Sequence, residues 1–169
     1  MSAKQRAFFG VALVVFAADR AGKLYAMQAI GAGERVSFVG DLLSLAHVPV
    51  AGGAFGLLRD WAPAAQLVAL GLLSLVCAAV VVGFYRGLAP GEHGSAAALG
   101  AVFAGVIGNF VDRVLHGAGI DFLHLGPPTA DQLPDFNLSD VAIVLGVVTL
   151  IVELLASEMA ARAQERPRR

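Results

Sequence analysis

The chain is short of charge and of cysteine, and each shortage excludes a class of protein. Only 15% of its 169 residues are charged, whereas a typical soluble domain carries about 25%. A single cysteine, Cys77, cannot form an internal disulfide, so the chain is no disulfide scaffold. The net charge of −1 offers no basic stripe to neutralise phosphates, which argues against nucleic acid as a partner. The four histidines are scattered, and without metal-ligand spacing we expect no metal and no other cofactor.

Apolar residues are abundant instead. They make up 57% of the chain, and the mean hydropathy of +0.74 indicates a bilayer protein of one domain. Four apolar segments are long enough to cross a membrane as helices. The sequence therefore predicts an all-α polytopic membrane protein with four transmembrane helices, at about residues 7–30, 61–85, 95–116 and 138–156.

The first segment has two interpretations. Lys4 and Arg6 precede an apolar run that ends at Ala18, which is similar to a secretory signal peptide. The apolar pattern continues to Ile30, however, and residues 7–30 would form about 36 Å of helix, so we interpret the segment as a retained transmembrane helix. Asp19 and Lys23 stand four residues apart, as a helical ion pair requires. They either face other helices as a buried pair or mark a frayed helix end.

Between the first two helices, residues 31–60 are polar and rich in glycine. Short runs within residues 36–45 are too brief to span a membrane and favour strands or interfacial structure. Pro49 and the glycines that follow it make a regular helix improbable over residues 47–56. This stretch either binds an extended peptide by backbone pairing or is an ordinary turn.

Basic residues predict the topology. Seven fall on one side of the four segments and three on the other, and this bias places both termini in the cytoplasm. Residues 31–60 and 117–137 are then outer segments, and the basic tail 157–169 is a cytoplasmic segment, amphipathic or disordered, that contacts anionic membrane lipid. The seven are Lys4, Arg6, Arg86, Arg162, Arg166, Arg168 and Arg169; the three are Arg35, Arg59 and Arg113.

Residues 108–140 hold five of the eight aspartates. Asp121 follows the third helix and Asp140 opens the fourth, so their carboxylates can meet at one membrane depth. Two close carboxylates share a proton, and such a pair can activate water and protonate a scissile carbonyl. In the alternative, Asp140 only caps a helix and Asp121 is a solvated loop residue. We interpret Asp131 and Asp135 as solvated loop acids and residues 124–135 as a lid over the pair.

The motifs themselves resemble the lipoprotein signal peptidase (signal peptidase II) family. The resemblance rests on Gly108-Asn109-Phe-Val-Asp112-Arg113, Asp121-Phe122 and Phe136-Asn137-Leu-Ser-Asp140, on the Asp19/Lys23 spacing, and on Gly52-Gly53-Ala54-Phe55-Gly56. It implies a four-helix aspartyl endopeptidase of the bacterial cytoplasmic (inner) membrane with its active site near the outer face. It also implies a small extracytoplasmic β-cradle between the first two helices, which would hold the peptide next to the active site. Its substrates would be prolipoproteins, cleaved before a diacylglyceryl-modified cysteine, and its inhibitors would be of the globomycin type.

Carried over by position, the resemblance assigns catalysis to Asp121 and Asp140. It gives binding or supporting roles to Asn109, Arg113, Asn137, Asp112, Asp19, Lys23 and Gly52. One position departs from the family pattern, because Val50 stands where the cradle block usually has asparagine. The lost amide motivates an alternative function, a non-catalytic paralogue that binds lipoprotein precursors or globomycin-like antibiotics. A small transporter is disfavoured, since the polar residues gather at one membrane face.

Overall fold

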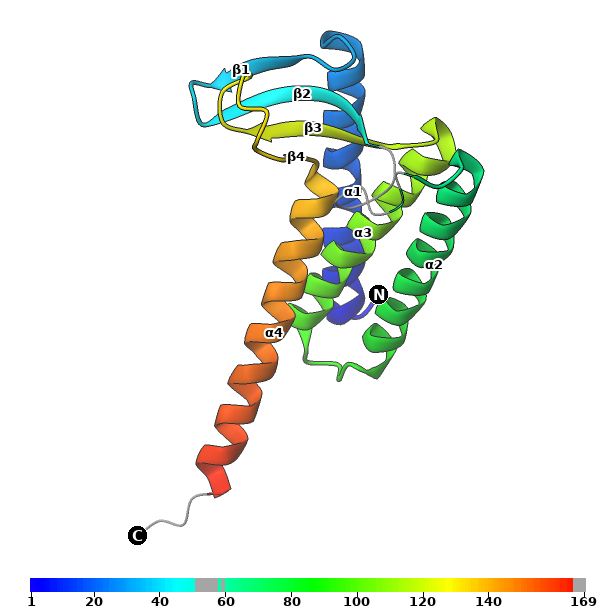
Figure 1. The fold of residues 1–169 in the computed structure, drawn as a ribbon. Helices are drawn as coiled ribbons and strands as arrows, with labels where there is room; N and C mark the ends of the chain where they lie inside the picture. Colours follow the sequence, from blue (N-terminus) through cyan, green and yellow to red (C-terminus); the bar gives the residue numbers. More distant parts are fainter. Residues whose placement is uncertain (51–57, 59, 166–169) are drawn as a thin grey trace.

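The protein consists of a helical bundle with a small sheet at one end (Figure 1). The structure, a computed structural model, describes residues 1–50, 58 and 60–165. The helices are α1 (Ala3–Ala29), α2 (Pro63–Gly87), α3 (His93–His116) and α4 (Leu138–Glu165). The strands are β1 (Arg35–Val39), β2 (Leu43–Val50), β3 (Gly119–Leu125) and β4 (Asp135–Phe136). The N-terminus and the end of α4 lie away from the sheet.

Local sequence accounts for most helix ends. Ser2 and Gln5 form a capping box at the start of α1, Pro63 opens α2, and Gly117 ends α3 in the left-handed region at φ 73°, where glycine carries no steric penalty. The expected end of the fourth helix was wrong, because α4 runs through residues 157–165 of the predicted tail. Good helix formers fill this stretch, and Glu158 pairs with Arg162 one turn later at 3.3 Å.

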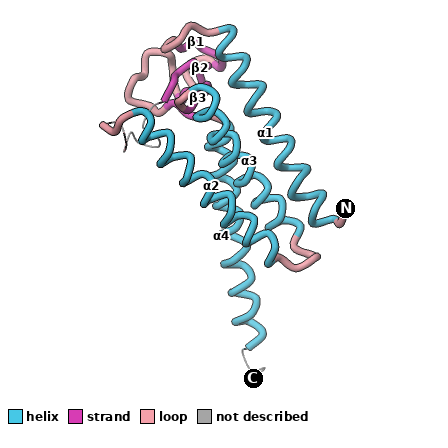
Figure 2. Tube along the Cα trace, turned by 90° about the vertical axis from the view of Figure 1, so that its right-hand side faces the viewer, coloured by secondary structure: helices cyan, strands magenta, loops and turns pink. Residues whose placement is uncertain are grey.

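Helix α3 is the centre of the bundle and packs against each of the other three helices (Figure 2). Small residues make this possible. A Cβ on Gly100 would collide with the backbone carbonyl of Phe8 in α1, and one on Gly105 with that of Ser139 in α4. Close backbone approach of this kind is how helices associate in lipid. The C-terminal ends of α1 and α3 and the start of α4 thereby lie close to the sheet (Figure 1).

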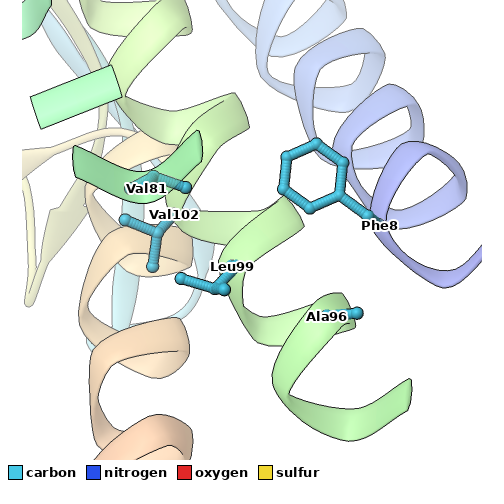
Figure 3. Close-up of a cluster of buried hydrophobic side chains, with 5 residues drawn as sticks. All are labelled: Phe8, Val81, Ala96, Leu99 and Val102. Carbon is cyan, nitrogen blue, oxygen red and sulfur yellow. The ribbon is translucent and has the colours of Figure 1, made fainter. Parts of the chain in front are cut away.

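An apolar cluster holds the opposite end of the bundle (Figure 3). Phe8 of α1 is 3% exposed and contacts Leu99 and Ala96 of α3. Val81 of α2 joins the same cluster. Lys4 also connects α1 to the end of α2, because its Nζ donates hydrogen bonds to the carbonyl oxygens of Tyr85 and of the C-cap residue Leu88, at 3.3 and 2.7 Å. The helices are thus fixed to one another at the end remote from the polar residues.

Three helices within the described residues are long and apolar enough to cross a membrane: Pro63–Gly87, His93–His116 and Leu138–Ala163. Helix α1 is equally long, with 27 residues, but it carries Asp19, Arg20 and Lys23 in its second half. The chain is therefore a multi-pass membrane protein, mostly helical with a small antiparallel sheet.

The sheet corrects the expected cradle. Its four strands are antiparallel in the order β1-β2-β3-β4, and only β1 and β2 come from the segment between α1 and α2. Strands β3 and β4 belong to the segment before α4, and Val48 of β2 pairs with Asp121 of β3. The stretch 124–135 is accordingly no simple lid, because His124 and Asp135 pair across β3 and β4.

Candidate active site

Asp121 lies in β3 rather than in a loop. In the strand, Asp121 stands between Ile120 and Phe122, which are both buried. Phe122 packs into the space left by Gly22 of α1. The Asp121 side chain is buried, with 8% of the residue exposed, so the interpretation as a solvated loop acid does not fit. The strand pairing with β2 fixes its position along the sheet.

Asp140 lies in the first turn of α4, as the sequence predicts. Its backbone N–H donates to Asn137 Oδ1 at 2.9 Å, and its Oδ2 accepts the backbone N–H of Asn137 at 3.3 Å. This reciprocal arrangement is a capping box, with Asn137 at the N-cap and Asp140 three residues later. The carboxylate therefore sits at the positive end of the helix dipole.

Asn137 also connects the two aspartates. Its Nδ2 donates to Asp121 Oδ1 at 2.7 Å, while its Oδ1 and backbone N–H are bonded to Asp140. Every polar group of Asn137's side chain is thus used. Asn137 is 2% exposed, so the two carboxyl groups approach each other across one buried amide.

A second amide, Asn109 of α3, holds Asp140 from the other side. Its Nδ2 donates to Asp140 Oδ1 at 2.8 Å, and Lys23 Nζ lies 3.5 Å from its Oδ1. Arg113 NH1 donates to the backbone carbonyl of Asn109 at 2.8 Å. Because Lys23 has only donors, it orients the Asn109 amide with its N–H groups toward Asp140.

Next to this pair lies a group of four charges, three of them buried and Arg20 partly so, which we call the ionic cluster: Asp19, Arg20, Lys23 and Asp112. Lys23 Nζ lies 2.7 Å from Asp19 Oδ2 and 2.5 Å from Asp112 Oδ2. Asp19, Lys23 and Asp112 are at most 1% exposed, so Asp19 and Lys23 do not mark a frayed helix end. Asp19 Oδ1 also accepts the backbone N–H of Ser139 at 3.0 Å, which ties α1 to the start of α4.

Arg20 is the member of the ionic cluster that the sequence interpretation missed. Its NH2 lies 3.1 Å from Asp19, bonds Asp112 and donates to Gly108 O at 3.2 Å. The available signal was a third charge beside Asp19 in an apolar helix, since charges inside membrane helices pair with one another. With Arg20 the cluster holds two cations and two anions.

Burial and, after it, the nearby Asp140 carboxylate raise the pKa of Asp121 from 3.8 to about 6, although the Asn137 hydrogen bond and Lys23 act in the opposite direction. Both oxygens of Asp140 accept N–H hydrogen bonds, from Asn109 and from the backbone of Asn137. The arrangement can therefore hold a proton on Asp121 below about pH 6.

Of the cradle block, the structure describes Val50 alone. Gly52 and the rest of residues 51–57 are outside the described residues. Val50, the last residue of β2, pairs with Gly119 two residues from Asp121. Partners in an antiparallel pair share a face and residues two apart lie on the same face, so Val50 and Asp121 are on one side of the sheet. No group of three His, Cys, Asp or Glu side chains that could hold a metal occurs among the residues described.

Comparison with known proteins identifies the family. The model of the signal peptidase II family matches residues 11–156. The chain belongs to this family. It is 32% identical to the lipoprotein signal peptidase of Geobacter sulfurreducens, over 94% of this chain and 97% of that protein. It is also 32% identical to that of Pseudomonas putida, over 90% of this chain and 88% of that protein.

A solved structure of a bacterial membrane enzyme has the same fold. It superposes with a TM-score of 0.74 at 26% identity, covering 86% of this chain and 90% of that one. Membership of the signal peptidase II family makes the chain a protease, and the structural likeness agrees with a multi-pass membrane protein.

Proposed function

We propose that this chain is an aspartic endopeptidase that cleaves the signal peptide of prolipoproteins before the diacylglyceryl-modified cysteine, with Asp121 and Asp140 as its catalytic pair. Family membership supports the substrate class. The observation that carries the chemistry is that Asn137 bonds both carboxyl groups: its side-chain amide donates to Asp121 and its backbone N–H donates to Asp140. Because only one of two close carboxyls ionises readily, the pair retains a proton for catalysis.

The roles of the two aspartates follow from their hydrogen bonds. Ionised Asp140 removes a proton from water, and the resulting hydroxide attacks the scissile carbonyl. Protonated Asp121 donates its proton to the carbonyl oxygen as the tetrahedral intermediate forms. On collapse the C–N bond breaks, the proton gained by Asp140 passes to the leaving amine, and a hydroxyl of the intermediate returns a proton to Asp121, which restores the starting state of the pair. Asn109 and Asn137 keep the Asp140 carboxylate in place throughout this sequence.

The position in the membrane is part of the proposal. Helix α1 also crosses the membrane and brings the number of transmembrane helices to four. Its charged residues Asp19 and Lys23 are buried against α3 and are not exposed to lipid. The basic bias of the loops places both termini in the cytoplasm of a bacterial inner membrane. The sheet and the aspartate pair then lie at the outer face, where the precursor's cleavage site arrives after export.

Purified protein and a lipid-modified precursor peptide provide the test. Asp121→Asn and Asp140→Asn are expected to lower the cleavage rate by about a thousandfold or more, because neither half of the pair replaces the other. Conversion to the shorter product is followed on a gel, and the exposed Asp41→Asn serves as control. Normal processing by either variant would refute the assignment.

The non-catalytic paralogue is not favoured. Its only support was Val50, which leaves both aspartates and their amide partners in place. The chain matches lipoprotein signal peptidases of several species, and the match covers most of the length of each of them. Binding of a precursor peptide without cleavage by the unmodified protein would restore this alternative.

A further inference from the structure

A second polar cluster lies on the other face of the sheet and takes no part in the chemistry above. Asp135 of β4 is at its centre. Arg35 of β1 donates to both Asp135 oxygens, at 2.9 and 2.6 Å, and His124 of β3 lies with Nδ1 3.0 Å from Asp135 Oδ1. We call these three residues the clasp. It joins the first, third and fourth strands of the sheet.

The clasp is built rather than incidental. His124 is fully buried, and its Nε2 has no hydrogen-bond partner among the described residues, so Asp135 is its one recorded anchor. The side chains of Arg35 and Asp135 are 18% and 12% exposed. Because their bond is bidentate, its geometry is fixed as well as its charge. The expectation of a solvated Asp135 was wrong for this reason. Asp131 also reaches Arg35, but its side chain is 86% exposed.

Asp135 stands two residues before Asn137, whose side-chain amide donates to the Asp121 carboxyl and whose backbone N–H donates to that of Asp140. The connection between them is Phe136, which pairs with Leu123 of β3. A strand of only two residues has few backbone hydrogen bonds of its own, so side-chain anchors decide where it lies. Displacement of a catalytic group by about 1 Å can lower a rate by about a hundredfold.

We infer that Arg35, His124 and Asp135 are positioning residues of the peptidase: they anchor the strand that enters α4 and so fix Asn137 between Asp121 and Asp140. The inference rests on the proposed function. Asp135 also acts through space, because its charge favours the protonated form of Asp121. The other charged groups around Asp121 are Asp140 of α4, Lys23 of α1 and Arg113 of α3.

Arg35 and Asp135 can be separated by the sign of their electrostatic effect. Asp135→Asn removes a negative charge and is expected to move the alkaline limb of the pH–rate profile to lower pH. Arg35→Gln leaves the Asp135 charge uncompensated and is expected to move that limb to higher pH. Both changes loosen the entry to α4, so both lower kcat by about tenfold with KM changed less than about twofold.

The experiment measures kcat and KM across pH on folded, detergent-solubilised protein, with thermal unfolding as a check. Arg35→Lys keeps the charge but loses the bidentate fork, so kcat falls while the alkaline limb stays in place. Asp131→Asn, outside the clasp, is the matched control and should resemble the unmodified enzyme.

Opposite limb shifts with lowered kcat support the inference. Unchanged kcat in Arg35→Gln and Asp135→Asn, or shifts in the same direction, overturn it while the proposed function stands. If the unmodified protein fails to cleave, or if Asp140→Asn still cleaves, the proposed function falls and this inference with it.

Discussion

Two groups of carboxylates lie next to each other in this protein, and they are held by different partners. In the ionic cluster, Asp19 and Asp112 are each bonded to both Lys23 and Arg20. In the proposed catalytic pair, Asp121 and Asp140 are bonded mainly to the amides of Asn137 and Asn109.

The difference separates stability from reactivity. A buried charge matched by a cation is stable, and removal of one partner leaves the other uncompensated. An amide orients a carboxyl group without neutralising it, so burial and, after it, the repulsion of Asp140 raise the pKa of Asp121 to about 6. The ionic cluster supports the fold, and the amide-held pair retains the proton that hydrolysis requires.

The largest effect is expected from a substitution that breaks the ionic cluster. Asp112→Asn leaves two cations facing one anion and should destabilise the protein by about 3–5 kcal/mol, because an uncompensated buried charge remains. Thermal or denaturant unfolding in detergent measures the loss. Asp121→Asn, which removes a carboxyl from the amide-held pair, should retain the fold while losing activity.

The double variant Arg20→Gln/Asp112→Asn sharpens this result. It removes one cation and one anion, so we expect part of the lost stability to return, as coupling between contacting residues requires. A double variant that is no more stable than Asp112→Asn would show that charge balance does not govern the cluster.

The next effect concerns pH. If Asp121 is the proton donor, kcat/KM falls as pH rises through about 6, because this quantity reports groups of the free enzyme. Stability follows the same sign. The folded pKa of Asp121 is raised from 3.8, so its contribution to folding is complete below about pH 4 and is lost as pH rises through about 6. An alkaline limb absent from the rate profile would contradict the donor role.

The smallest effect is expected from a substitution of Val50, which lies near Asp121. Val50→Asn places an amide on the same face as Asp121, where it can donate to a bound peptide or to globomycin. One net hydrogen bond contributes about 0.5–1.5 kcal/mol, so globomycin should bind about two- to tenfold more tightly. Inhibition curves compare the two proteins, and Val48→Ile, which adds no polar group, is the control. Equal inhibition would remove Val50 from inhibitor recognition.

Features that depend on neighbours in the chain could be predicted from sequence. The Asn137–Asp140 cap follows from residue types three apart, and the Asp19–Lys23 pair from a spacing of four. Long apolar runs likewise placed helices α2, α3 and the first part of α4, because composition alone determines which segments lipid accepts. The motifs named the family before any contact was known.

Features that depend on long-range pairing required the tertiary structure. Strand β3 pairs with β2, more than 60 residues earlier, and only this register makes Asp121 a buried strand residue instead of a loop acid. Arg35 reaches Asp135 across 100 positions, and Arg20 reaches Asp112 across 92. Burial and partners at such separations come from packing, which local sequence does not encode. The sequence by itself determined which aspartates to examine; tertiary packing decided which are neutralised and which retain a proton.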